Sequence, residues 1–143
     1  MQTIPILQNV YMAYKRIIDI NIQLTKRWRH SLGISTENSI LACIEQLIMA
    51  KNAPKALKIT YLIKADSHLE ITRMKLRLML ELKLANETKI FQTQKILLET
   101  GRMLGGCFGS RFKNRQYAPN HPPTSHRKYI VKMGHTQYMV LAK

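Results

Sequence analysis

Three groups of basic residues are the part of this chain whose types and spacing could do chemistry, and that chemistry is the binding of phosphate. The first group is Lys26, Arg27, Arg29 and His30. The second contains Arg73 and Arg77, four residues apart, together with Lys64, Lys75 and Lys83. The third is Arg111, Lys113, Arg115, Arg127 and Lys128. A solvated basic surface is the ordinary interpretation of each group alone. Together they predict salt-sensitive, weakly sequence-specific contact with a phosphate backbone.

The charge balance of the chain points to the same chemistry. Of 143 residues, 23 are Lys or Arg and 8 are Asp or Glu, which gives a formal charge of +15. Residues 100–143 contain eight Lys or Arg and no acidic residue. A surplus of this size predicts a polyanionic partner, with nucleic acid as the first interpretation and an anionic membrane surface as the rival. The absence of a concentrated Trp, Phe and Leu face beside the basic residues argues against the membrane.

No catalytic motif is recognisable in the sequence. None of the six glutamates is followed three residues later by His, as a di-iron bundle would require, and neither H-E-x-x-H nor G-x-x-x-x-G-K-[ST] occurs. The stretch 101–106 begins like a phosphate loop but continues with Cys107 and Phe108. We therefore expect a protein that is not an enzyme and that has no metal site and no cofactor. Without an evident signal peptide or a long apolar run, we expect it in the cytoplasm.

The apolar residues predict four amphipathic helices, at about 5–27, 36–51, 55–84 and 88–112. In the third, Leu62, Leu69 and Leu76 recur every seven residues. The expected breaks are 31–33, 52–54 and 85–87, and Ser35 or Thr36 is the expected N-cap of the second helix. Short connections favour an all-α, antiparallel up-down four-helix bundle over residues 1–113, followed by a basic C-terminal extension.

The extension, residues 114–143, differs in composition. Pro119, Pro122 and Pro123 exclude a continuous helix through that part. Residues 129–141 mix β-branched and aromatic residues. They are compatible with a short β-hairpin around Gly134, or with disorder until a partner binds.

Two features of the helices leave alternatives open. Gly101, Gly105 and Gly109 are spaced four apart, which makes a smooth stripe for close packing or an oligomer contact on a continuous helix. Equally, the helix could end at Gly105 and Gly106. Glu70 precedes Arg73 by three residues, so an ion pair within the helix is the alternative to a binding role for the arginines.

Three stretches, in this order, resemble the four-helix-bundle family that includes the accessory variability determinant (Avd) of diversity-generating retroelements. They are KRWRHSLG at 26–33, ADSHLEITRMKLRL at 65–78 and ETGRMLGGCFGSRFKNR at 99–115. Bundles found within ribosomal RNA intervening sequences are also similar. The resemblance covers roughly residues 7–115.

This resemblance implies a homo-oligomeric barrel, a pentamer, of four-helix protomers. It implies a non-catalytic accessory protein that binds a reverse transcriptase and its template RNA or cDNA and supports error-prone cDNA synthesis and mutagenic retrohoming. By motif match, Arg73 and Arg77 are the first candidates for the binding surface, followed by the 26–30 group and then by Arg111, Lys113 and Arg115. The alternatives are a general nucleic-acid-binding bundle without a polymerase partner, and a structural oligomer that docks on anionic lipid. The sequence does not identify which RNA is bound.

Overall fold

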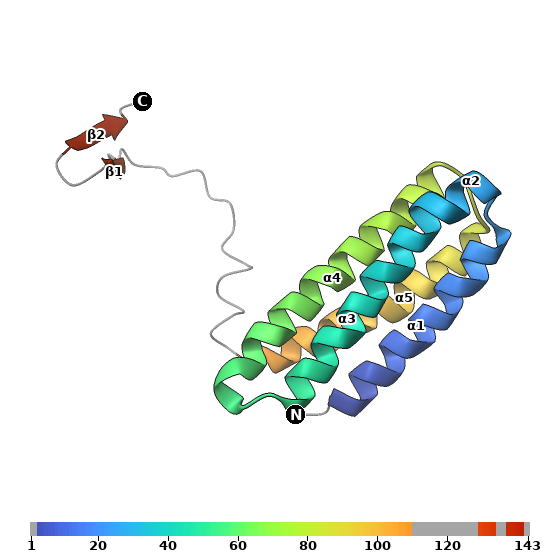
Figure 1. The fold of residues 1–143 in the computed structure, drawn as a ribbon, viewed down its shortest axis with the longest axis horizontal. Helices are drawn as coiled ribbons and strands as arrows, with labels where there is room; N and C mark the ends of the chain where they lie inside the picture. The colour runs from blue at the N-terminus through green and yellow to red at the C-terminus, as the bar shows by residue number, and fades with distance from the viewer. Residues whose placement is uncertain (1–2, 110–128, 134–136, 142–143) are drawn as a thin grey trace.

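The computed structural model describes residues 3–109, 129–133 and 137–141. Its helical part is a bundle built from α1 (Thr3–Gln23), α2 (Lys26–Trp28), the π-helical segment η1 (Arg29–Gly33), α3 (Ile34–Asn52), α4 (Lys55–Glu81) and α5 (Glu87–Cys107). Since α2, η1 and α3 follow one another without a gap, these residues form four long rods (Figure 1). The rods alternate in direction, as expected for an antiparallel bundle.

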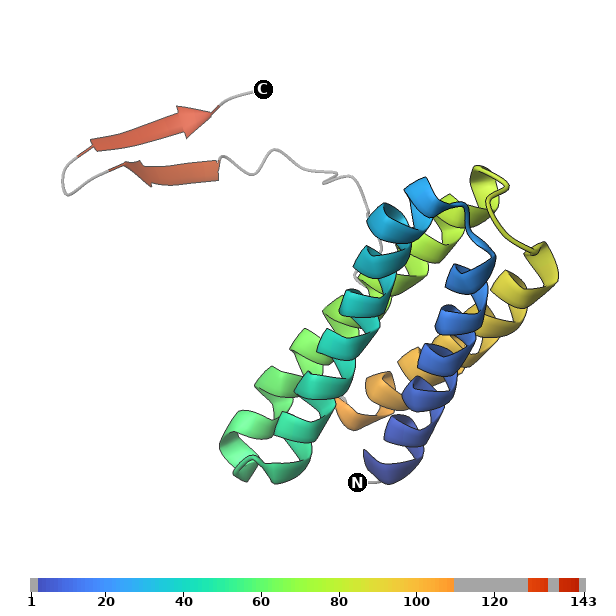
Figure 2. The same ribbon diagram turned by 45° about the vertical axis from the view of Figure 1, so that its right-hand side comes forward.

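The core lies along the common axis of the four rods. The heptad-spaced Leu62, Leu69 and Leu76 of α4 are buried, and so are Ile90, Leu97 and Leu104 of α5. Each rod packs on two neighbours, in the cyclic order α1, α3, α4, α5 (Figure 2). The predicted bundle is confirmed for the described helices, because each apolar stripe meets another.

The predicted break at 31–33 is wrong. The chain breaks at Leu24 and Thr25, where Thr25 adopts an extended conformation, and it is helical from Lys26 onward. α1 ends at Gln23, and the carbonyl oxygen of Ile22 in its last turn accepts a hydrogen bond from the Arg29 side chain, as described below. The expected N-cap is also wrong: Thr36 is buried inside the helix and donates from its Oγ1 to the carbonyl oxygen of Leu32.

Of the other two breaks, the one at 52–54 is confirmed, whereas α4 ends at Glu81, three residues before the expected end at Leu84, so the last break covers residues 82–86. Pro54 precedes α4, and its carbonyl oxygen accepts hydrogen bonds from the N–H groups of Leu57 and Lys58. Asn86 caps α5 by accepting a hydrogen bond from the N–H of Lys89 at 3.1 Å. A proline at the start of a helix and an asparagine N-cap both match the local chemistry of the sequence.

Two strands lie in the C-terminal extension. β1 (Tyr129–Met133) pairs antiparallel with β2 (Gln137–Leu141), and Val131 is the register partner of Met139. These strands fall within 129–141, where the sequence left a strand pair open.

Candidate nucleic-acid interface

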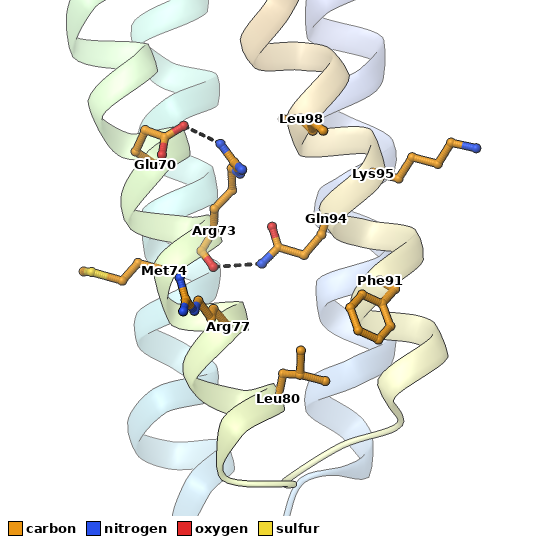
Figure 3. Close-up of a pocket in the computed structure, with 9 residues that line it drawn as sticks. All are labelled: Glu70, Arg73, Met74, Arg77, Leu80, Phe91, Gln94, Lys95 and Leu98. Atoms are coloured by element: carbon orange, nitrogen blue, oxygen red, sulfur yellow. Dashed lines mark hydrogen bonds and ion pairs between the residues drawn. The ribbon is translucent and has the colours of Figure 1, made fainter. Parts of the chain in front are cut away.

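A groove of about 560 Å³ runs between α4 and α5 on the outside of the bundle (Figure 3). From α4 it is lined by Glu70, Arg73, Met74, Arg77 and Leu80, and from α5 by Phe91, Gln94, Lys95 and Leu98. It contains Arg73 and Arg77, the two arginines that the motif match ranks first. Three lining side chains are basic and one is acidic, so the groove has a positive surplus.

The register of α4 explains why Arg73 and Arg77 share this groove. Leu69, Thr72 and Leu76 are buried against the core. Residues 73 and 77 are one turn apart and lie beside that buried stripe, toward α5. The predicted common face of the two arginines therefore agrees with the geometry.

Both arginines also form ion pairs on α4. Arg73 donates from Nη1 to Glu70 Oε1 at 2.7 Å, and Arg77 donates from Nε to Glu81 Oε1 at 3.0 Å. The second pair is well exposed, with 75% of the Arg77 side chain accessible, so it contributes little stability and water competes with it. The pairing of Arg73 with Glu70 confirms the alternative interpretation of that residue.

Gln94 ties the two walls of the groove together. Its Nε2 donates to the main-chain carbonyl oxygen of Arg73 at 2.9 Å, and this bond crosses the gap between α5 and α4 (Figure 3). Because the acceptor belongs to the main chain, this bond sets the position of α5 along α4 independently of the conformation of the Arg73 side chain.

The half-buried carboxylate of Asp66 lies two turns of α4 before Arg73 and three turns before Arg77. Burial raises the pKa of Asp66 from its ordinary value of 3.8, the nearby Glu70 raises it further, and Arg73 opposes both effects. Asp66 and Arg73 are seven residues apart and therefore lie on the same face of α4. The residues thus form a charge cluster of two acids and one arginine.

Lys75 has a different role from its two neighbours. Its Nζ donates to the carbonyl oxygen of Ser35 at 2.9 Å and also to the Ser39 hydroxyl, so it joins α4 to α3 on the side away from the groove. Burial lowers the pKa of Lys75.

The 26–30 group lies at the end of the bundle where α4 connects to α5 (Figures 1 and 2). Lys26 is exposed, and the Arg27 guanidinium lies 5.5 Å from the centre of the Trp28 ring. Arg29 is engaged in the fold: its Nη2 donates to the carbonyl oxygens of Ile22 at 2.7 Å and Leu24 at 3.1 Å. Arg29 therefore caps α1, and it is a weaker candidate for phosphate than Lys26, Arg27 and the exposed His30.

Other predicted residues are placed differently or not at all. Arg111, Lys113, Arg115, Arg127 and Lys128 lie outside the described residues.

Gly101 and Gly105 both lie within α5, whereas Gly109 follows it with a φ of 68°. The helix passes through Gly105 and Gly106 and ends at Cys107, so it neither ends at 105–106 nor continues through Gly109 to residue 112, and both expectations are wrong. A Cβ at Gly105 would meet no atom within 4 Å, so no close approach inside this chain requires that glycine.

Charge remains in excess across the bundle itself. Residues 3–109 contain 16 Lys or Arg and all 8 Asp or Glu. Among these residues only three ion pairs form, at Arg73, Arg77 and Arg102.

Within the described part, no group of three or more His, Cys, Asp or Glu could hold a metal ion. Nor do the described helices include one with the length and apolar character needed to cross a membrane.

Sequence reasoning missed the α5 wall of the groove. Phe91, Lys95 and Leu98 follow the i, i+4, i+7 spacing of one helix face, and that face is the neighbour of the buried Ile90, Leu97 and Leu104 stripe. An exposed phenylalanine beside a lysine one turn away was the signal that could have found it.

Comparisons with known proteins add no relative to this description. No family model matches the sequence, and no curated protein or solved structure shows significant similarity to it.

Proposed function

We propose that this chain is a non-catalytic accessory protein of a diversity-generating retroelement, which binds the reverse transcriptase and its template RNA or cDNA. The observation that carries the proposal is the groove in which Arg73 and Arg77 lie side by side on a bundle with twice as many basic as acidic residues. The motif order that resembles the Avd family supplies the biological setting.

The charge distribution supports the nucleic-acid part. The exposed side-chain ammonium groups of Lys26, Lys83 and Lys95 have no ion-pair or hydrogen-bond partner among the described residues. Phosphates that bind such cations release counterions, so affinity falls steeply with salt. The exposed ion pair of Arg77 can exchange its carboxylate for a phosphate at small cost.

Exposed apolar residues support assembly with protein partners. On α3, Ile34, Leu41 and Ile48 are all exposed and are spaced seven residues apart, so they form a stripe on one face. Ile71 and Leu78 of α4 are exposed at the same spacing. Contiguous exposed apolar residues mark protein contacts. In this proposal the stripes serve contacts between copies in a homo-oligomer, a pentamer by the resemblance, or contacts with the polymerase.

The test is co-purification of the full chain with the reverse transcriptase encoded beside it, with and without nuclease and over a salt series. A nuclease-resistant complex supports the accessory role. A complex that disappears with nuclease contradicts the polymerase contact and leaves the general nucleic-acid-binding bundle.

A matched pair of double variants tests the groove. Arg73→Glu with Arg77→Glu should weaken RNA or polymerase binding at least tenfold. Lys51→Glu with Lys55→Glu makes the same charge change on exposed residues at the other end of the bundle, where α3 ends and α4 begins. Helicity measured by circular dichroism checks that both variants fold. Equal binding by the two variants would contradict the assignment of the groove.

A further inference from the structure

We infer that the α4–α5 groove is a single-strand site, in which one unstacked nucleobase lies against the Phe91 ring while the phosphates that flank it contact Arg77 and Lys95. The inference rests on the proposed function, because it specifies the form of nucleic acid that the same surface takes. It assigns the recognition to an aromatic face in addition to charge.

Phe91 is the first observation. Its side chain is on α5 between the buried Ile90 and the exposed Gln92, and it is 57% exposed. The ring points toward the space between the helices, above Leu80 (Figure 3). An aromatic ring at the lip of a basic groove is the stacking platform that proteins use for single strands, since every base has a π-face.

The shape of the groove is the second observation. Its volume of about 560 Å³ is in the usual range for sites that take a small organic group. Met74, Leu80 and Leu98 give it apolar walls. Bases within a duplex are stacked on one another and cannot enter such a slot, whereas bases of single strands and loops can be splayed out.

The polar atoms around the ring complete the site. Gln94 uses its Nε2 on the Arg73 carbonyl, and its Oε1 has no hydrogen-bond partner among the described residues. That oxygen can accept a hydrogen bond from a base N–H or amino group. Lys95 lies one turn after Phe91, and its side chain extends into solvent on the side of α5 that faces away from α4 (Figure 3), where it can meet a phosphate on one side of the stacked base while Arg77 meets a phosphate on the other.

Charge decides between a polyanion and a second copy of the chain as occupant. Arg73, Arg77 and Lys95 outnumber the single lining acid, Glu70. At this basic groove a second copy, with 23 Lys or Arg against 8 Asp or Glu, would mostly bring like charges together, whereas the exposed apolar residues assigned to contacts between copies do not line the groove. A nucleic-acid strand offers both the opposite charge and a planar apolar group.

The experiment measures binding of the full chain to a short single-stranded RNA and to the same sequence in a duplex, by fluorescence anisotropy at one fixed salt concentration. Phe91→Leu should weaken binding of the single strand about fivefold or more and leave duplex binding unchanged, since the loss of one stacked base weakens binding by a factor of about 5 to 150. Phe91→Trp should retain or increase the single-strand affinity.

Tyr11→Leu is the matched control. Tyr11 is also 57% exposed, and Lys15 lies 5.6 Å from the centre of its ring, but it is on α1 and does not line the groove. Its loss should leave single-strand binding unchanged.

The outcomes test the nucleic-acid function and the single-strand site separately. If the wild-type chain binds neither RNA, the proposed nucleic-acid function itself fails. If it binds both and Phe91→Leu behaves as wild type, or loses affinity for the duplex equally, only the single-strand site is overturned. A change of oligomer mass in Phe91→Leu with unchanged RNA binding also overturns it, and assigns the groove to a second copy.

Discussion

The side-chain amide of Asn21 donates from Nδ2 to the main-chain carbonyl oxygen of Gly33 at 2.9 Å, and the same nitrogen donates to Glu37 Oε1 at 2.7 Å. These bonds join the last turn of α1 to the π-helical segment and to the first turn of α3. A Cβ at Gly33 would lie 3.2 Å from the Asn21 amide and 3.3 Å from a Leu24 methyl group. Only a glycine allows this close approach without displacing a side chain that two hydrogen bonds hold in place.

In Gly33→Ala the displaced side chains should cost about 1–3 kcal/mol, and the better helix propensity of alanine should return about 1 kcal/mol. The free energy of unfolding should therefore fall by a net amount of up to about 2 kcal/mol. Gly106→Ala is the control, since a Cβ there would meet no atom within 4 Å and the residue is exposed on α5. It should raise the free energy of unfolding by about 0.5–1 kcal/mol. Urea denaturation of both variants tests this, and a stabilised Gly33→Ala would show that Asn21 can move aside.

Arg29 and Lys26 should separate stability from binding. Arg29→Ala leaves the carbonyl oxygens of Ile22 and Leu24 without their capping guanidinium, and should lower the free energy of unfolding by about 1–2 kcal/mol. Arg29→Lys should recover only part of this loss, because an ammonium lacks the planar fork. Lys26→Ala should change stability by less than about 0.5 kcal/mol but weaken RNA binding. The reverse pattern would return Arg29 to the binding surface.

The bundle could be predicted from the sequence because its core is periodic, but the position of the first break could not. Ser31, Leu32 and Gly33 look like the end of a helix, since glycine in an isolated helix is unfavourable. In the structure the glycine is required by a contact with Asn21, twelve residues earlier. Tertiary packing overrides local propensity at this point, and no local pattern contains that contact.

The groove was predictable only on its α4 side. Arg73 and Arg77 share a face by spacing alone, and a reader of the sequence can see that Lys75 does not. That Gln94 and Phe91 complete the groove depends on which face of α5 packs next to α4, and this follows from the bundle order. The residue whose role most differs from its basic character, Arg29, differs because helix ends need caps that a charge pattern does not reveal.

Asp66 predicts a pH dependence of stability. Its pKa is raised in the folded state, by burial first and by Glu70 second, so the folded chain holds the proton more tightly than the unfolded chain does. The stability that this provides is present below the ordinary value of 3.8 and is lost as pH rises through the folded pKa. Asp66→Asn should consequently be more stable than wild type at neutral pH, and the difference should vanish in acid. Denaturation curves across this range give the answer, and a variant less stable at neutral pH would show that attraction to Arg73 outweighs burial.

The two cysteines should differ in reactivity. Cys43 is fully buried, and burial, with a smaller effect of Asp66, raises the pKa of its thiol to about 12. The thiolate is the reactive form, so at pH 8 Cys43 should be alkylated only when the chain unfolds. Cys107 is half-buried at the end of α5 and should react in the native protein. Mass spectrometry after iodoacetamide treatment, with and without denaturant, distinguishes the sites. Fast native labelling of Cys43 would mean that α3 and α4 separate readily.

Gln94→Ala should loosen the groove without unfolding the bundle. Removal of the bond to the Arg73 carbonyl should lower the free energy of unfolding by about 0.5–1.5 kcal/mol. Gln92→Ala removes an exposed bond, in which Arg16 donates to Gln92 Oε1 at 3.0 Å, and should cost less because water replaces it. The two variants also distinguish an effect on the alignment of the groove walls from an effect on the stability of the bundle. If Gln94 sets the height of Phe91 relative to Arg77, its loss weakens single-stranded RNA binding, whereas Gln92→Ala, one residue after Phe91, leaves it unchanged. An equal loss of RNA affinity in both variants would mean that the α5 surface acts through general charge and hydration, and that the alignment of the two groove walls has no part in binding.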